Sequence, residues 1–178
     1  MMSEFNHDTY NDDYIRAILQ NTKIIAMVGA SARTSRPSYF VLKYLLQKGF
    51  NVIPVNPREA GSEVLGQQVY ASLSDIPNPI DMVDIFRNSH AAGELSDEAI
   101  TLGAKTVWMQ LTVRNDDAAR RAEAAGLQVV MNRCPKIEYG RLSGEIGWMG
   151  VNSRKLSSKK PILSGTRVQS FGLGYKKN

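Results

Sequence analysis

Lys23 to Lys48 read KIIAMVGASARTSRPSYFVLKYLLQK, and this stretch decides the fold. It opens with an apolar run of strand length, Lys23 to Val28, and continues through the small residues Gly29-Ala30-Ser31. From Tyr39 to Lys48 the apolar residues recur at helical spacing. A strand, a turn of small residues and a helix, in this order, are typical of the first unit of a nucleotide-binding sheet.

The turn between this strand and helix has the composition of a phosphate-binding site. Small residues let a ligand approach the backbone, and the free amides at a helix N-terminus attract an anion. The turn also supplies positive charge and hydroxyl groups, from Ser31, Arg33, Ser35, Arg36 and Ser38. The alternative is an ordinary strand–helix turn that holds no ligand.

The Gly-x-Gly-x-x-Gly fingerprint of dinucleotide-binding proteins is incomplete here. Ser31 and Thr34 stand where its second and third glycines would fall. The second expected strand ends in Val55-Asn56-Pro57, without the acidic residue that usually binds the ribose hydroxyls of NAD. Both features argue against an NAD(P)-dependent oxidoreductase, which stays the alternative function.

Strand and helix patterns alternate along the chain. We expect strands at residues 23–28, 50–55, 81–86, 105–110 and 127–131, and helices at residues 12–20, 39–48, 89–102 and 115–125. Residues 58–80 read as an irregular connection with a short strand near 68–70. The pattern predicts an α/β fold of the Rossmann-like, doubly wound type: a mainly parallel sheet with helices on both faces.

Ligands of such sheets bind at the carboxyl ends of the strands. The candidate site therefore lies in the loops that follow the strands, at residues 29–38, 56–58, 86–89, 111–114 and 132–136. Gln110, at the end of a strand, is a candidate ligand neighbour, whereas the preceding Trp108 and Met109 are expected in the core.

The positive charge of the chain is concentrated at its C-terminal end. Residues 1–140 carry 14 Lys and Arg against 16 Asp and Glu, whereas residues 141–178 carry 8 against 1. We expect one domain at residues 1–144 and a basic C-terminal extension at residues 145–178. No nucleic-acid motif accompanies these charges, so we do not expect specific nucleic-acid binding.

The sequence carries no signal for secretion, membrane insertion or metal binding. Neither a signal peptide nor an apolar run of membrane-spanning length is present, which predicts a cytoplasmic protein without membrane contact. The single cysteine, Cys134, and the two histidines have no metal-ligand spacing, so no metal site is expected. Cys134 is interpreted as a small buried residue, with a reactive thiol as the alternative.

An ordered set of motifs gives the chain a resemblance to a known family. They are the segment GASARTSRPSYFVLKYLLQKGFNVIPVNP, followed by GQQVYASLSDIP, VDIFR, WMQL and VMNRCPKIE. Over roughly residues 15–140 the sequence resembles the small, single-domain coenzyme A-binding proteins, relatives of the coenzyme A-binding domain in the α subunit of succinyl-CoA synthetase. The resemblance implies a Rossmann-type domain that binds coenzyme A and brings no catalytic activity with it.

The resemblance also implies which residues bind the cofactor. Gly29, Ala30, Ser31, Arg36 and Ser38 match positions around the phosphates, Asn56 and Pro57 match positions beside the adenosine, and Phe86 and Arg87 match positions along the cofactor's path. Three positions depart from the family pattern: Thr112 replaces a glycine, Asn132 an aspartate and Tyr139 a histidine.

The charges suit coenzyme A, which carries a 3′-phosphate in addition to a diphosphate. Arg33 adds a cation to the turn, and Arg58 is either a partner of the 3′-phosphate or a solvated loop residue. Ligation by this chain alone is not expected, because the synthetase works through a phosphorylated histidine of a second domain and no histidine follows His90 here. We therefore predict a non-catalytic carrier or regulatory protein that binds coenzyme A or acyl-CoA. A protein partner or a homodimer stays open.

Overall fold

The computed structural model describes residues 5–144. One compact unit runs to Lys136 and a second begins at Ile137, and each is described by itself. The sheet and the pocket described below belong to the first unit. The boundary expected between residues 144 and 145 stays a prediction, because the basic extension lies outside the described residues.

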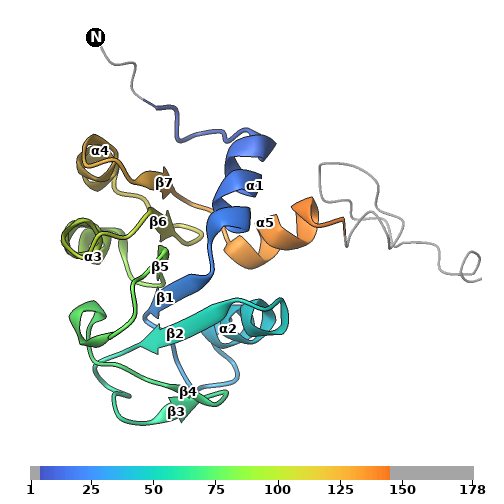
Figure 1. Cartoon of the computed structure of the whole chain (residues 1–178), viewed down its shortest axis with the longest axis vertical. Coiled ribbons are helices and arrows are strands. Elements are labelled where there is room, and N and C mark those ends of the chain that lie inside the picture. The colour runs from blue at the N-terminus through green and yellow to red at the C-terminus, as the bar shows by residue number, and fades with distance from the viewer. Residues whose placement is uncertain (1–4, 145–178) are drawn as a thin grey trace, which may run out of the picture. The chain divides into compact units, whose positions relative to one another are not determined.

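A five-stranded sheet forms the centre of the first unit (Figure 1). Its strands, in spatial order, are β2 (Asn51–Val55), β1 (Ile24–Val28), β5 (Met82–Ile85), β6 (Thr106–Met109) and β7 (Gln128–Val130). Every neighbouring pair is parallel. The chain moves outward from β1 to β2 in one direction and from β5 to β7 in the other, which confirms the doubly wound α/β fold.

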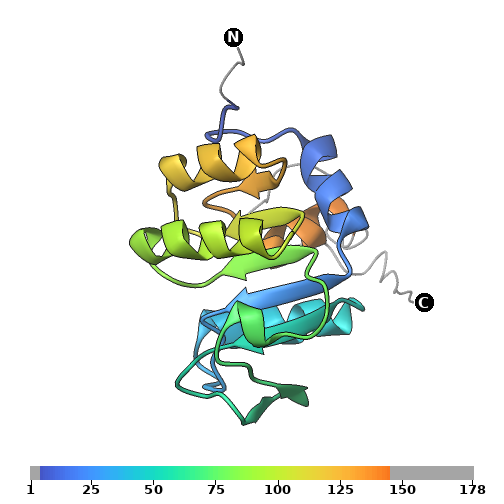
Figure 2. The same cartoon turned by 60° about the vertical axis from the view of Figure 1, so that its left-hand side comes forward.

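Helices cover both faces of this sheet. Figures 1 and 2 show α3 (Ser89–Thr101) and α4 (Asp116–Ala124) on one face, and α1 (Asp12–Asn21) and α2 (Pro37–Gln47) on the other. The side chains of Asn11, Asn88 and Asn115 cap α1, α3 and α4, as short amide side chains do at helix starts. α5 (Pro135–Leu142) begins inside the stretch that the sequence predicted as a final loop.

The connection between β2 and β5 contains more structure than the single short strand expected from the sequence. β3 (Glu63–Val64) and β4 (Gln67–Gln68) form an antiparallel hairpin, and the 3-10 helix η1 (Leu73–Asp75) follows. The hairpin turn holds Leu65 and Gly66 at φ 53° and 78°. Such turns usually carry Asn-Gly or Asp-Gly, and Leu-Gly therefore gave no turn signal in the sequence.

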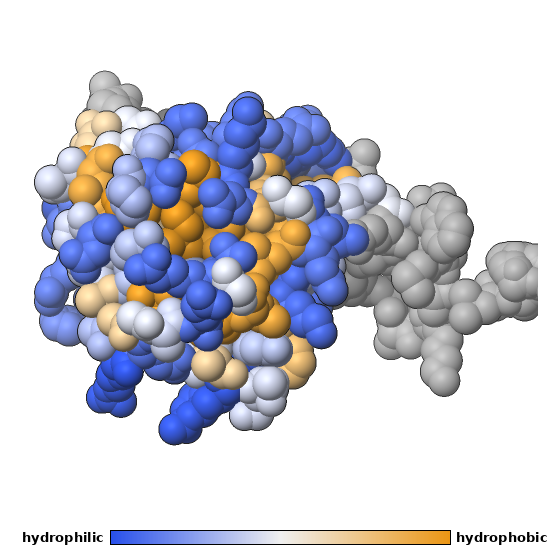
Figure 3. Space-filling view, turned by 60° about the horizontal axis from the view of Figure 1, so that its bottom comes forward, coloured by the Kyte–Doolittle hydropathy of each residue, from blue (hydrophilic) through white to orange (hydrophobic). Residues whose placement is uncertain are grey.

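The core on the α3/α4 face joins valines and isoleucines of the strands to alanines of the helices. Small helical residues such as Ala92, Ala99 and Ala118 let the helices lie close to the sheet. Trp108 and Met109 are fully buried, as predicted. Viewed from the lower side of Figure 1, the surface is mainly hydrophilic and surrounds a smaller apolar area (Figure 3). In residues 5–144 no helix is long and apolar enough to cross a membrane.

Tyrosine hydroxyls cover the outer edge of β7. The Tyr14 hydroxyl donates to the carbonyl oxygen of Val129 and accepts from its amide, both at 3.1 Å, and the Tyr10 hydroxyl accepts from the amide of Met131 at 2.7 Å. Burial raises the pKa of Tyr14 to about 12, so this hydroxyl keeps its proton at neutral pH. The N-terminal segment thus satisfies the backbone groups that an edge strand leaves open.

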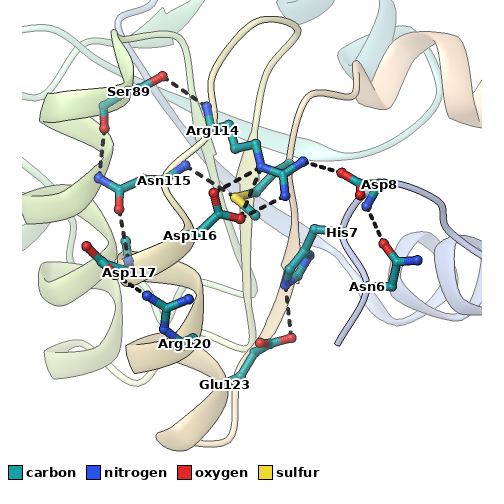
Figure 4. Close-up of polar contacts among 12 residues, drawn as sticks. Asn6, His7, Asp8, Ser89, Arg114, Asn115, Asp116, Asp117, Arg120 and Glu123 are labelled. Carbon is teal, nitrogen blue, oxygen red and sulfur yellow. Dashed lines mark hydrogen bonds and ion pairs between the residues drawn. The ribbon is translucent and has the colours of Figure 1, made fainter. Parts of the chain in front are cut away.

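Ion pairs hold the same N-terminal segment against α4 (Figure 4). Arg114 donates to Asp8 at 2.7 Å and to Asp116 at 3.0 and 3.1 Å, while His7 lies 3.4 Å from Glu123. The side-chain amide of Asn115 donates to the backbone oxygen of Ser89 at 2.9 Å and so links α4 to the start of α3.

Candidate functional site

A pocket of about 810 Å³ opens at the carboxyl ends of β1, β2 and β5. It includes the point where the strand order reverses, the usual ligand position in doubly wound sheets. Its lining comes from three loops and consists of Gly29, Ser31, Arg33, Arg36, Pro37, Ser38, Asn56, Pro57, Arg58, Glu59, Phe86 and Arg87.

Gly29 forms the tight start of the turn between β1 and α2. Its φ of 88° is left-handed, and a Cβ built on it would lie 2.4 Å from the carbonyl oxygen of Phe86. Its amide donates to the carbonyl oxygen of Val55 at 2.9 Å. Only a glycine allows the three strand ends to approach this closely.

The start of α2 borders the pocket, where Pro37 has no amide hydrogen and the amide of Tyr39 donates to the carbonyl oxygen of Arg36 at 3.0 Å. Pro37 occupies the first turn, and Arg36 at the N-cap position makes no capping hydrogen bond with its side chain within the described residues. Arg33 and Arg36 are exposed, whereas Ser38 is buried. The N-terminal end of a helix dipole beside two cations attracts an anion.

Asn56 joins the loop after β2 to the loop after β1. Its side-chain nitrogen donates to the carbonyl oxygen of Ala30 at 2.7 Å, and its side-chain oxygen accepts from the amide of Arg58 at 3.0 Å. An aspartate could not supply the first of these bonds, because an ionised carboxylate has no donor. The uncharged amide therefore fixes the pocket wall without adding negative charge.

The four arginines of the pocket have no carboxylate partner among residues 5–144. Arg33, Arg36, Arg58 and Arg87 are exposed, and none forms an ion pair with another residue of the part of the chain that the structure describes. Other arginines of the same unit are paired, such as Arg121, which lies 2.8 Å from Asp97. The charged residues of the lining are these four arginines and Glu59, so the pocket presents an excess of positive charge to a polyanionic ligand.

The structure brings most of the predicted site residues together. Ten of the twelve line the pocket: Gly29, Ser31, Arg33, Arg36, Ser38, Asn56, Pro57, Arg58, Phe86 and Arg87. Ala30 is buried and contributes its backbone oxygen to Asn56. Gln110 lies outside the lining, where its buried amide donates to both carboxylate oxygens of Asp84, at 2.9 and 3.2 Å.

Pro37 and Glu59 also line the pocket; Pro37 falls inside the predicted loop at residues 29–38, whereas Glu59 lies one residue beyond the predicted loop at residues 56–58. Glu59 lies four residues beyond the end of β2, so the search for an acid at the strand end did not reach it. Its carboxylate accepts from the Ser31 hydroxyl at 3.3 Å and from the amide of Ala32 at 2.9 Å.

The departures Thr112 and Asn132 contact one another. Both adopt left-handed backbone, at φ 69° and 56°, and the amide of Thr112 donates to the side-chain oxygen of Asn132 at 2.8 Å. A β-branched residue with positive φ is an outlier, since this backbone is the one that glycine adopts without strain. Thr112 therefore adopts a backbone conformation that favours glycine.

Asp84 is a buried acid in the centre of the sheet. Burial raises its pKa to about 7, although the hydrogen bond from Gln110 favours the ionised form. Cys134 is also buried, which agrees with its interpretation as a packing residue. Among residues 5–144 no three His, Cys, Asp or Glu side chains form a group that could hold a metal ion.

Comparison with known proteins agrees with this geometry. The uncharacterized protein YneT of Bacillus subtilis is 36% identical over 125 residues, which cover 70% of this chain and 91% of that protein. A solved structure of a hypothetical protein from Pyrococcus horikoshii has a TM-score of 0.73 at 43% identity, and the match covers 81% of this chain and all of that one, 100%.

A longer relative is an enzyme subunit. The α subunit of the ADP-forming acetate–CoA ligase I of Pyrococcus furiosus is 31% identical over 93 residues, which cover 50% of this chain and 20% of that subunit. The family model described as "CoA binding domain" matches residues 23–140, a range that includes every residue of the pocket lining. The chain is therefore a member of the CoA-binding domain family.

Proposed function

We propose that this protein binds coenzyme A or an acyl-CoA in the pocket at the ends of β1, β2 and β5. The observation that carries the proposal is the set of four arginines around the β1–α2 turn, which have no carboxylate partners among residues 5–144. Coenzyme A supplies a diphosphate and a 3′-phosphate, which require more cationic groups than the diphosphate of NAD. Family membership supports the same ligand.

In this proposal each wall of the pocket has one task. The β1–α2 turn and Arg36 bind the diphosphate, Asn56 and Pro57 lie beside the adenosine, and Arg58 pairs with the 3′-phosphate. Phe86 and Arg87 border the remainder of the cofactor. Ala30 supports the wall formed by Asn56, because its carbonyl oxygen accepts from the side-chain nitrogen of Asn56.

We further propose that the protein is a carrier or a regulatory protein without catalysis of its own. The chain spans only 20% of the acetate–CoA ligase subunit that it resembles, so the remainder of that subunit has no counterpart in this match. A regulatory role requires a protein partner or a second copy of the chain. Sedimentation with and without coenzyme A measures whether the ligand changes the assembly state.

Calorimetric titration with coenzyme A, dephospho-CoA, NAD and NADP tests the ligand. We expect coenzyme A to bind most tightly, and dephospho-CoA more weakly because it lacks the 3′-phosphate. Arg36→Ala should weaken coenzyme A binding by about 10- to 100-fold, since a charge-assisted hydrogen bond is lost. Arg16→Ala is the control, because Arg16 is a half-buried arginine on α1 outside the pocket lining, and it should leave the affinity unchanged. Tighter binding of NAD than of coenzyme A would contradict the proposal.

A further inference from the structure

Glu59 is a carboxylate inside a pocket whose other charged lining residues are four arginines. It is half-buried, and its two oxygens accept from the Ser31 hydroxyl at 3.3 Å and from the amide of Ala32 at 2.9 Å. We call these two donors the anion seat. The carboxylate bonds to this seat while the four pocket arginines form no ion pair with it or with any other acid of the described chain.

The backbone around Glu59 holds the carboxylate in this position. The amide of Glu59 donates to the carbonyl oxygen of Asn56 at 3.1 Å, and its own carbonyl oxygen accepts from the amide and the hydroxyl of Ser62 at 3.1 and 2.6 Å. Asn56 is in turn bonded to Ala30, next to the seat. Because the loop is fixed at both sides, the carboxylate is present at the seat at a high effective concentration.

A phosphate at the turn requires the same donors. A backbone amide directs one hydrogen, and it cannot donate fully to the Glu59 carboxylate and to a phosphate oxygen at the same time. Two anions on adjacent positions also repel one another in this partly desolvated pocket. A ligand phosphate that enters the seat must therefore displace Glu59.

We propose that Glu59 is an internal competitor that determines which anions the pocket accepts. A single small anion, such as inorganic phosphate, gains too few contacts to replace the tethered carboxylate. A ligand anchored at several points, with a diphosphate and a second phosphate for the arginines, gains enough to do so. This role rests on the proposed binding of coenzyme A, and it makes Glu59 a specificity-determining residue of that site.

Glu59→Gln tests this role, because glutamine keeps the acceptor for the Ala32 amide and loses the charge. Glu59→Ala vacates the seat completely, and Glu63→Gln, an exposed acid on β3, is the charge-matched control. We expect about tenfold tighter binding of coenzyme A to Glu59→Gln by calorimetry, and a larger gain for Glu59→Ala. Thermal-shift titration with inorganic phosphate should show binding to both Glu59 variants at concentrations that leave the wild type and Glu63→Gln unchanged.

Each outcome decides the role of Glu59. Weaker binding of coenzyme A to both variants would show that Glu59 contacts the ligand, and unchanged binding would show that the seat stays unused; either result overturns the inference. If neither the wild type nor any variant binds coenzyme A, the proposed function fails. The phosphate titration still decides whether Glu59 competes with an anion at the seat. If Glu59→Ala does not fold, the comparison of Glu59→Gln with Glu63→Gln is sufficient.

Discussion

At the scale of single residues, Gly29 is required by two independent constraints. Its backbone is left-handed, and its missing Cβ leaves room for the carbonyl oxygen of Phe86. Gly49 shares the first constraint, at φ 94°, but has no atom within 4 Å of its virtual Cβ. A comparison of alanine substitutions at Gly29 and Gly49 therefore separates backbone strain from steric overlap.

We predict that Gly29→Ala destabilises the protein more than Gly49→Ala. Gly49→Ala is the control, and its free energy of unfolding should fall by about 1 kcal/mol because alanine is strained at a positive φ. Gly29→Ala should lose several kcal/mol more because the strand ends must separate. Urea denaturation of both variants measures the difference. Equal losses would mean that the Phe86 loop moves away without cost.

Asp84 makes stability depend on pH. Its pKa is raised in the folded protein to about 7 from 3.8, so between these values the folded state holds a proton that the unfolded state has released. Stability should therefore fall as pH rises from about 4 to 7, by on the order of 4 kcal/mol in total, and stay level above.

We predict that Asp84→Asn removes most of this pH dependence and stabilises the protein at pH 8. Asparagine is neutral at every pH and can still accept from the amide of Gln110 through its side-chain oxygen. Denaturation midpoints between pH 4 and 8 provide the measurement. A variant that loses stability in parallel with the wild type would assign the pH dependence to other groups.

At the scale of secondary-structure elements, the edge strands are closed in different ways. On β2, Asn51 donates toward β1 and Gly29 donates to Val55, so the alternate residue Pro54 faces outward, where it has no amide to offer. On β7 the amides are present and tyrosines satisfy them. On both edges a distant segment supplies partners: the amide of Tyr70 donates to the carbonyl oxygen of Pro54 at 3.0 Å, and the tyrosine hydroxyls bind β7.

Tyr14→Phe should therefore destabilise the protein by about 1–3 kcal/mol, because the amide and carbonyl of Val129 lose their partner while the aromatic ring remains. Tyr39→Phe is the control, since the Tyr39 hydroxyl has no hydrogen bond within residues 5–144. Thermal unfolding of both variants tests the prediction, and amide exchange at Val129 should accelerate only in Tyr14→Phe. Equal stability would show that water replaces the hydroxyl without cost.

The sequence was most informative where local rules determine structure. The helix expected from residue 115 is confirmed, and Asn115 caps it, since short polar side chains bond to the amides of a first helical turn. The strands were recognised because both of their faces are apolar. Gln110 was expected beside the ligand, but its orientation depends on the buried Asp84 of another strand. Glu59 was missed because its contact with Ala32 spans two loops that only the folded sheet brings together.

At the scale of the whole molecule, every residue of the pocket lining falls between positions 29 and 87. A protein truncated after residue 144 should therefore bind coenzyme A with an affinity within about twofold of the full chain. Calorimetric titration of both proteins measures this, with circular dichroism to establish that the truncated protein is folded. Much weaker binding by a folded truncation would place part of the ligand contact in residues 145–178.

The walls of the pocket are joined by the same backbone bonds that build the sheet. The amide of Gly29 donates to Val55, and the amide of Phe86 donates to the carbonyl oxygen of Val28 at 2.8 Å, so the ends of three strands are already in place before a ligand arrives. Binding then requires little conformational ordering of the main chain, and apart from the movement of Glu59 the binding surface is preorganised. The association rate should consequently be governed by diffusion and by the attraction between arginines and phosphates, and should fall as the salt concentration rises.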